Sequence, residues 1–351
     1  MNETETASVI EVAAALRFDE IALETYLAGH LPGFSGALEV KQFNAGQSNP
    51  TYRLSTGSNR YVLRKKPPGQ LLPSAHAVDR EYRVMSALQD SAVPVPRVLH
   101  LCLDRDIIGT EFYLMEMVEG RVFHDPSLPD LSPEARRQFY DGYIRSLAAL
   151  HAIDPAKIGL QDFGRPKGFI TRQITRWSKQ YQATQTEPIE AMDKLIDWLP
   201  ANIPDDDQAA IVHGDFRPGN VIAGGEDTNI KAILDWELCA LGHPLADLGY
   251  CLANYYTDTL ATGTFRGLDH TALGIPTEKE FVDLYCQHSG RSALDEYLFY
   301  VVFSLFRGAA IIQGVYKRGL DGNASSSEAV RFGHFARSRA ETAWRIVAEN
   351  L

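Results

Sequence analysis

The chain has 351 residues, of which 45% are hydrophobic, 10% aromatic and 23% charged, a composition typical of folded globular proteins rather than disordered or fibrous ones. Its formal net charge of -11 argues against a general affinity for nucleic acid, because a polyanion is repelled outside a local basic patch. We therefore expect a small molecule as the partner.

The sequence carries no obvious targeting or membrane segment. Residues 1–10 are polar and acidic, without the basic and apolar regions of a secretory signal. The longest apolar run, 297–306, is shorter than the roughly twenty residues of a membrane span. The cysteines show neither C-x-x-C pairs nor zinc-type spacing, which is typical of free thiols in a reducing compartment. We expect a cytoplasmic protein, and the sequence leaves its oligomeric state open.

The first part of the chain predicts short helices followed by strands. An irregular helical pattern over residues 12–29 predicts one or two helices, with Asp19 as an N-cap. From residue 38 the apolar period changes to that of strands. A three-stranded meander is expected over 38–43, 52–54 and 61–63, with turns at Gly46 and Gly57.

The first of these turns is small and polar: Gly46, Gln47, Ser48 and Asn49. Backbone N–H groups in such a turn can approach the phosphate oxygens of a nucleotide. An ordinary polar hairpin is an equally good interpretation of these residues alone.

The third strand ends in three basic residues, Arg64, Lys65 and Lys66. Because side chains alternate along a strand, Arg64 shares the face of Val62 and Lys65 points away. A helical stripe over 76–89 follows, and Glu81 on it could reach back to Arg64 or pair locally.

The remainder of the chain predicts two more strands and then mainly helices. The strands are expected at 98–103 and 112–118, and a well-capped helix begins at Ser132 and Pro133. Later helices are expected over 189–199, 247–256, 278–288, 294–316 and 327–349.

Residues 211–235 form the chemically distinctive stretch. Two β-branched pairs bracket a polar loop, and a turn at 224–225 leads to a third short strand that ends at Asp235. We expect Asp215, Asn220 and Asp235 to converge on one edge of a small β-structure. Phosphoryl transfer needs a carboxylate for the incoming hydroxyl and oxygen ligands for Mg²⁺, and these side chains supply both.

Spacing strengthens this interpretation. Asp215 precedes Asn220 by five positions, the interval between the catalytic Asp and the metal-binding Asn of protein kinases. Both residue types are also common turn formers. Three motifs in the right order favour the catalytic interpretation: H-G-D-x-x-x-x-N at 213–220, I-x-D-W-E at 233–237 and G-x-P-x-x-D-L at 242–248.

These motifs resemble those of the aminoglycoside phosphotransferase and choline kinase family. The segments 46–49 and 61–69 look most like the kinase-like domains associated with acyl-CoA dehydrogenases. The resemblance implies an α+β, protein-kinase-like bilobal fold. A β-rich N-lobe, with N-terminal helices and the phosphate-covering loop, is expected over 1–118. A mainly helical C-lobe, with the catalytic loop and the acceptor site, is expected over 119–351.

The resemblance also implies roles for individual residues. Asp215 would be catalytic, Asn220 and Asp235 would hold Mg²⁺, and His151 and Asp247 would be structural. Arg64 stands where these kinases usually have a Lys, which leaves open whether Arg64 or a neighbouring Lys contacts the phosphates. We favour Arg64, paired with Glu81. The further residues expected at the nucleotide are Gly46, Gln47, Ser48 and Asn49 in the turn and Glu116 and Val118 at the hinge.

The implied activity is ATP- and Mg²⁺-dependent phosphoryl transfer to a hydroxyl of a small molecule. An aminoglycoside or choline-type kinase is an alternative, and Arg64 keeps open an inactive nucleotide-binding protein. A protein kinase is disfavoured because only eleven residues separate Asp235 from Asp247, which leaves no room for an activation loop. The sequence does not decide between ATP and GTP.

For the acceptor we hypothesise an anionic hydroxylated compound, such as a hydroxy acid or its acyl thioester. Glu237 and Arg307 are the residues that we expect to contact it. Arg307 interrupts an apolar helix, where a buried charge needs a partner. The chain beyond it is locally basic, although a solvated basic helix face would look the same. The other basic residues are Lys317, Arg318, Arg331, Arg337, Arg339 and Arg345.

Overall fold

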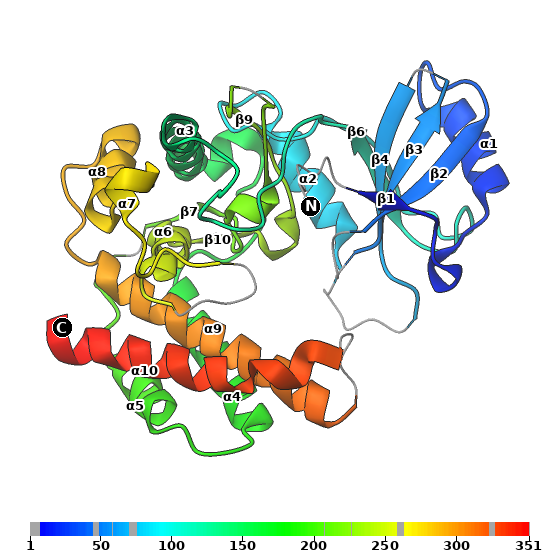
Figure 1. Ribbon diagram of the computed structural model, residues 1–351. Coiled ribbons are helices and arrows are strands. Elements are labelled where there is room, and N and C mark those ends of the chain that lie inside the picture. Colours follow the sequence, from blue (N-terminus) through cyan, green and yellow to red (C-terminus); the bar gives the residue numbers. More distant parts are fainter. Residues whose placement is uncertain are drawn as a thin grey trace. The chain divides into compact units, whose positions relative to one another are not determined.

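The computed structural model describes residues 8–44, 49–57, 59–69, 76–206, 208–225, 227–257, 263–322 and 327–350. The chain divides into two compact units (Figure 1). Unit 1 is Met1–Val122 with Asn220–Cys239, and unit 2 is Phe123–Gly219 with Ala240–Leu351. The expected division had one boundary at residue 118. In the structure the chain instead passes from unit 1 to unit 2 after Val122, and residues 220–239 belong to unit 1.

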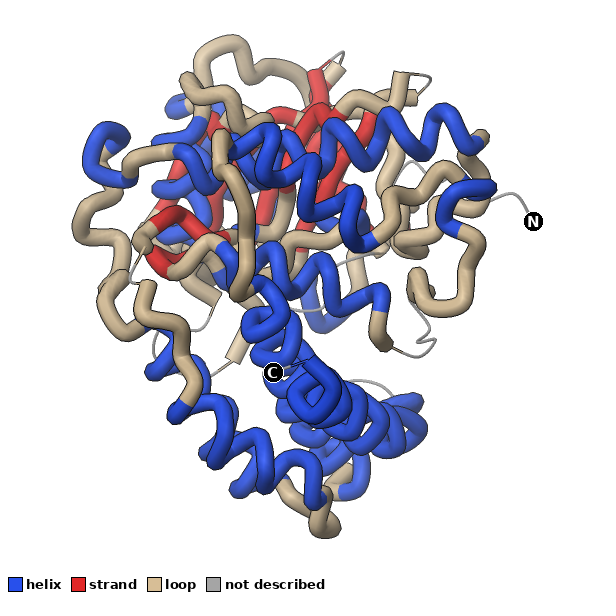
Figure 2. Tube along the Cα trace, turned by 90° about the vertical axis from the view of Figure 1, so that its left-hand side faces the viewer, coloured by secondary structure: helices blue, strands red, loops and turns tan. Residues whose placement is uncertain are grey.

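Unit 1 is built on an antiparallel sheet whose strands are ordered β1-β2-β3-β4-β6-β5, shown as arrows in Figure 1 and in red in Figure 2. The meander β2 to β4 confirms the strands and the turn at Gly57 that the sequence predicts, while Gly46 lies outside the described residues. The strands are β1 (Val9–Ile10), β2 (Leu38–Phe43), β3 (Thr51–Thr56), β4 (Asn59–Lys65), β5 (Val98–Cys102) and β6 (Phe112–Glu116).

One face of this sheet forms a hydrophobic core with helix α1 (Glu20–His30). Alternate residues of β3, Tyr52 and Leu54, are fully buried and pack with Leu23 and Leu27 of α1. Asp19 caps α1 as predicted, because its side chain accepts a hydrogen bond from the backbone of Ala22. Helix α2 (Val78–Leu88) packs against β5 and β6.

The returning segment 220–239 belongs to unit 1 because its backbone bonds there. Strands β8 (Val221–Ala223) and β9 (Ile230–Ile233) form a hairpin, and Ala223 bridges to Arg121. The N–H of Ile233 donates to the carbonyl of Pro94 at 2.8 Å. The 3₁₀ turn η4 (Trp236–Leu238) packs on α2 and buries Trp236.

The expectation of a single small β-structure around the catalytic motifs is wrong. Strand β7 (Ala210–Val212) pairs with β10 (Ala240–Gly242) in unit 2, whereas β8 pairs with β9 in unit 1. The chain is redirected after β7 by Gly214, at φ +84°, and by the 3₁₀ turn η3 (Pro218–Asn220). Asp215 therefore lies in unit 2, and Asn220 and Asp235 lie in unit 1.

Unit 2 is mainly helical. The expected helix starts are confirmed at α3, where Ser132 caps and Pro133 follows, and at α8, which has a capping box. Helix α4 was not anticipated. The helices are α3 (Pro133–Ala152), α4 (Phe169–Thr184), α5 (Glu190–Ala201), α6 (Leu245–Leu252), α7 (His270–Leu273), α8 (Glu278–Ser289), α9 (Tyr297–Leu320) and α10 (Gly333–Asn350).

Helix α9 is the centre of unit 2, packed against α4, α6 and α10. Among the described residues it is the one helix that is long and apolar enough to cross a membrane by length and composition. However, 67% of its most apolar stretch is buried inside the protein, as in a core helix.

Candidate active site

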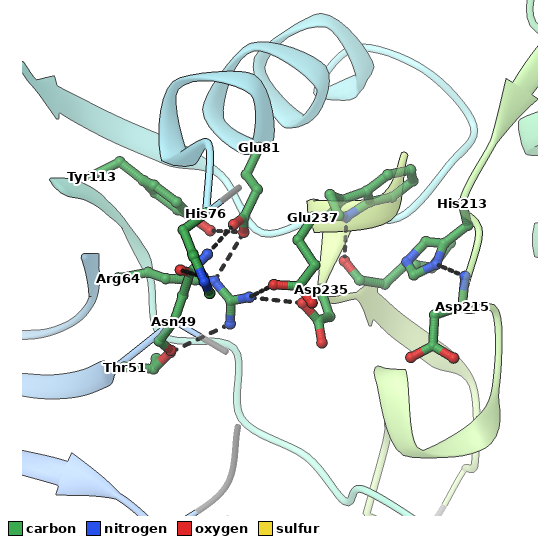
Figure 3. A network of polar contacts seen from close by, with 12 residues as sticks. Asn49, Thr51, Arg64, His76, Glu81, Tyr113, His213, Asp215, Asp235 and Glu237 are labelled. Atoms are coloured by element: carbon green, nitrogen blue, oxygen red, sulfur yellow. Dashed lines mark hydrogen bonds and ion pairs between the residues drawn. The ribbon is translucent and has the colours of Figure 1, made fainter. Parts of the chain in front are cut away.

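Arg64 lies at the centre of an ion-pair network in unit 1 (Figure 3). Its Nε is 2.9 Å from Oε2 of Glu81, and its Nη2 is 2.7 Å from Oδ1 of Asp235 and 3.6 Å from Oε2 of Glu237. The expected pairing of Arg64 with Glu81 is confirmed. The alternative of an exposed Glu81 is wrong, because its side chain is only 1% exposed and contacts Arg64.

The two lysines after Arg64 point elsewhere. Lys65 is buried against the rings of Phe18 and Tyr52, with Nζ 5.6 and 5.8 Å from their centroids. Lys66 forms an ion pair with Glu111. Of the three basic residues, Arg64 alone joins the network with Asp235, as its place on the face of Val62 predicts.

A second layer of hydrogen bonds holds Glu81. The amide of Asn49 donates to Oε1 at 2.7 Å, the hydroxyl of Tyr113 donates to Oε2 at 3.0 Å, and Nδ1 of His76 lies 2.9 Å from Oδ1 of Asn49. The side chain of Asn49 therefore braces Glu81 from a fully buried position. The other turn residues, Gly46, Gln47 and Ser48, lie outside the described residues.

Electrostatics in this network follow from burial and charge. Burial lowers the pKa of Arg64, but the carboxylates of Glu81, Asp235 and Glu237 together raise it above its usual value. Burial raises the pKa of the Glu81 carboxyl, and the Arg64 guanidinium opposes that rise. Arg64 is thus a permanent cation held in place by acidic groups.

Asn220 and Asp235 lie at one end of the β8–β9 hairpin. Val221 pairs with Ile233, and the carbonyl of Asn220 accepts a hydrogen bond from the N–H of Leu234 at 2.8 Å. Asp235 has φ +65°, a left-handed conformation that costs about 1–3 kcal/mol in a non-glycine residue and is common at functional sites.

The side-chain oxygens at this hairpin end fit Mg²⁺, a hard cation that prefers carboxylate and amide oxygens. In the described part of the chain, no three His, Cys, Asp or Glu side chains form a closed metal cage. Mg²⁺ is usually held by one or two protein side chains together with substrate phosphates and water. Asn220 and Asp235 are the residues that would hold it.

The loop after β7 carries Asp215 in unit 2. The buried carboxylate of Asp247 accepts hydrogen bonds from the N–H groups of His213 and Gly214, at 2.6 and 2.8 Å. Nδ1 of His213 in turn accepts from the N–H of Asp215 at 3.2 Å (Figure 3). His151 lies 3.4 Å from Asp247, so the structural roles expected for both residues agree with the geometry.

Asp247→Asn is expected to destabilise unit 2 by about 3 kcal/mol, because an amide NH₂ would face a buried backbone donor. Burial raises the pKa of Asp247, but His151, His213 and the Gly214 N–H outweigh burial and lower it overall. The stabilisation is therefore complete above the unfolded pKa of about 4 and is lost as pH falls through the lower folded value.

Urea unfolding of the Asp247→Asn variant measures this effect. The Asp283→Asn variant, changed at an exposed site on α8, is the control. The difference between wild type and Asp247→Asn should shrink below about pH 4. Equal stability of the two variants at neutral pH would contradict the bracing role.

Tyr250 and Arg217 both contact the side chain of Asp215. The hydroxyl of Tyr250 donates to Oδ1 at 2.6 Å, and Nε of Arg217 donates to Oδ2 at 3.3 Å. Burial raises the pKa of Tyr250 well above its usual value, and the charge of Asp215 raises it further. Tyr250 is therefore a permanent hydrogen-bond donor that orients the Asp215 carboxylate.

Arg307 of α9 supports the same loop. Its Nη2 donates to the carbonyl of Gly214 at 2.7 Å. Its guanidinium carbon lies 5.8 Å from the ring centroids of both Trp177 and Tyr250. The half-buried guanidinium of Arg307 therefore contacts a carbonyl and two aromatic rings in unit 2, next to the loop that carries Asp215.

The remaining predicted residues lie in unit 1. Glu116 ends β6, and its exposed side chain accepts a hydrogen bond from the N–H of Arg97 at 3.0 Å. Val118 follows in the half-buried connection after β6. Adenine binding by their backbone groups stays a prediction. Glu237 pairs with Arg64, and its contact with an acceptor also stays a prediction.

Sequence reasoning missed Tyr250 and Trp177. Tyr250 lies three residues beyond Asp247 in α6, so the helical period places the two on neighbouring parts of one face. Trp177 lies on α4, which has buried residues at Ile170, Ile174 and Tyr181. That spacing of four and seven is a helical signal that was available in the sequence.

Comparison with known proteins identifies the family of this chain. The sequence model of the phosphotransferase enzyme family matches residues 39–283. Mouse acyl-CoA dehydrogenase family member 10 is 47% identical over 336 residues, which make up 95% of this chain and 31% of that protein. This chain therefore spans about a third of that relative.

Solved structures show the same fold. A Ralstonia eutropha protein described as a candidate aminoglycoside phosphotransferase is 46% identical, with a TM-score of 0.87 over 95% of this chain and 99% of that one. A spectinomycin phosphotransferase solved with ADP and spectinomycin has a TM-score of 0.62 at 14% identity, covering 94% and 98% of the two chains.

The fold and the family match define a phosphotransferase with a kinase-like fold, and the expected α+β fold is confirmed. This chain belongs to the phosphotransferase enzyme family.

Proposed function

We propose that this protein transfers the γ-phosphoryl group of Mg²⁺–ATP to a hydroxyl group of a small molecule. The observation that carries the proposal is the held carboxylate of Asp215, which Tyr250 and Arg217 orient on a loop fixed by Asp247. Such a carboxylate orients a hydroxyl and accepts its proton. Nucleotide binding alone does not require a carboxylate that is oriented toward a hydroxyl group.

In this reaction the acceptor oxygen forms a bond to the γ-phosphorus, and the bond from that phosphorus to the β–γ bridging oxygen breaks. The acceptor proton passes to Asp215, and ADP leaves with the bond electrons. Asn220 and Asp235 would hold Mg²⁺, which would supply positive charge at the phosphate oxygens. Arg64, held by Glu81, supplies a fixed positive charge for the nucleotide phosphates.

For the acceptor we propose an anionic hydroxylated compound, such as a hydroxy acid or its acyl thioester. A cationic aminoglycoside calls for a carboxylate-rich pocket, and choline calls for an aromatic cage. Beside Asp215 the chain instead places the cation of Arg307, with its Nε buried and without a hydrogen-bond partner among the described residues. The relatives' dehydrogenase names agree with an acyl-type acceptor.

The experiment is a screen of phosphate transfer from Mg²⁺–ATP to hydroxy acids, hydroxyacyl thioesters, amino sugars and choline-like alcohols, repeated with GTP. Transfer to the first two classes is expected. Efficient phosphorylation of aminoglycosides or choline alone would overturn the choice of acceptor. Nucleotide binding without transfer to any hydroxyl compound would favour an inactive nucleotide-binding protein.

Arg307→Ala is expected to raise KM for an anionic acceptor by about tenfold or more, with KM for ATP unchanged. The reason is the loss of a charge-assisted hydrogen bond, worth about 1.5–3 kcal/mol. Steady-state kinetics with each substrate varied separately measures the effect. An equal rise in KM for a neutral alcohol acceptor would mean that Arg307 acts only through Gly214.

A further inference from the structure

Arg339 of α10 lies directly across Gly308 of α9. A Cβ atom added to Gly308 would lie 2.4 Å from Nη1 of Arg339, far closer than real contacts allow. Glycine in the interior of a helix costs about 1 kcal/mol relative to alanine. In the 24-residue helix α9, Gly308 therefore makes room for a guanidinium group at some cost in stability.

This guanidinium has no acidic partner among the residues that the structure describes. Its Nε is buried without a hydrogen bond, and so is Nε of Arg307. Burial lowers the pKa of Arg339, which the hydroxyl of Tyr250 only partly opposes. Elsewhere in the same region, Arg337 pairs with Glu187 and Lys317 pairs with Asp321. Arg339 thus differs from the paired cations around it.

Tyr250 connects this pair of arginines to the loop that carries Asp215. Its ring centroid lies 5.8 Å from the guanidinium carbon of Arg307, and its hydroxyl donates to Asp215 at 2.6 Å. Arg307 and Arg339 both interact electrostatically with Tyr250, and neither forms an ion pair with a carboxylate among the described residues. Two like charges in this position favour the binding of an anion.

We propose that Arg307 and Arg339 form a two-guanidinium subsite that binds the anionic group, a carboxylate or a phosphate, of the acceptor whose hydroxyl is oriented by Asp215. A planar guanidinium binds either oxyanion through parallel N–H bonds. Gly308, the neighbour of Arg307 in α9, leaves the space that the Arg339 guanidinium occupies. The inference rests on the proposed phosphotransferase function and adds Arg339 and Gly308 to its specificity.

The test uses the full chain and two variants that act differently. Arg339→Gln removes the charge, and Gly308→Ala keeps it but displaces it. Arg337→Gln on the same helix is the matched control, because its side chain is 40% exposed and pairs with Glu187. Calorimetry with inorganic phosphate and with acetate reports anion binding without catalysis. Kinetics with a hydroxy carboxylate, a matched hydroxyalkyl phosphate and a matched neutral diol report acceptor selection.

Both variants are expected to weaken binding of the preferred anion by about tenfold and to raise KM for the matching acceptor equally. KM for the diol and for ATP should stay the same, and Arg337→Gln should resemble wild type. If the variants weaken binding of acetate and of the hydroxy carboxylate, the subsite binds a carboxylate. If they weaken binding of inorganic phosphate and of the hydroxyalkyl phosphate, it binds a phosphate. Thermal unfolding should show both variants as stable as wild type or more so, since one loses an unpaired cation and the other a helical glycine.

Unchanged anion affinity in both variants would overturn the subsite, and so would a KM increase that is equal for charged and neutral acceptors. A loss of stability in Arg339→Gln together with unchanged anion affinity would assign Arg339 a structural role. Failure of the proposed function looks different. In that case no hydroxyl compound is phosphorylated by wild type, although anion binding still depends on Arg339.

Discussion

Asp215→Asn is expected to lower kcat by about 10²- to 10⁴-fold, the usual contribution of a positioned general base. The amide cannot accept the acceptor's proton, but its oxygen can still accept the hydrogen bond from Tyr250. The loop should therefore keep its shape, because Asp247 holds it through backbone groups. Binding of Mg²⁺–ATP should remain close to that of wild type.

Single-turnover kinetics and nucleotide calorimetry together separate these effects. Asp283→Asn, at an exposed position of α8, controls for loss of a negative charge in unit 2. Tyr250→Phe should give a smaller loss of kcat, since it removes only the group that orients Asp215. Wild-type turnover in Asp215→Asn, with any acceptor, would remove Asp215 from the mechanism.

Asp235→Ala is expected to abolish most of the Mg²⁺ dependence of nucleotide affinity, a loss on the order of 10- to 100-fold. Asp235 supplies a carboxylate oxygen at the end of the β8–β9 hairpin, and Mg²⁺ binding depends on such oxygens. The change also removes the ion pair between Asp235 and Arg64, but the ion pair between Arg64 and Glu81 remains. Affinity for ATP without metal should therefore change little.

Calorimetry with ATP, with and without Mg²⁺, measures the difference. Asp235→Asn is the second variant, because Asn tolerates the left-handed backbone at φ +65° better than Ala does. Asp227→Ala is the matched control, since Asp227 is exposed on the same hairpin and pairs with Lys231. The same Mg²⁺–ATP affinity in all four proteins would show that the metal is held elsewhere.

Local patterns were enough to predict much of unit 1. Strand alternation correctly separated Arg64, which reaches Glu81 and Asp235, from Lys65, which is buried against Phe18 and Tyr52. The two-residue period depends only on the backbone, so it can be read from neighbours in sequence. The spacing from Asp215 to Asn220 and the caps at Asp19 and Ser132 are equally local signals.

Strand pairing could not be predicted in this way. The sequence favoured one small β-structure over 211–235, but β7 takes β10 as its partner and β8 takes β9. Short apolar strands such as β7 and β8 match many partners, and the choice depends on loops and on packing across the fold. For the same reason, the division of the chain at Val122 and the return of 220–239 to unit 1 were not foreseen.

The sequence by itself identified the candidate groups: an aspartate on a polar loop, side-chain oxygens that would bind a metal, and a cation on the third strand. Only the tertiary structure decided which side chains orient these groups. Tyr250 contacts Asp215, which lies 35 residues earlier in the sequence. Arg339 of α10 lies next to Gly308 of α9. Such contacts come from the packing of α6, α9 and α10, and no local period in the sequence specifies which residues meet when helices pack.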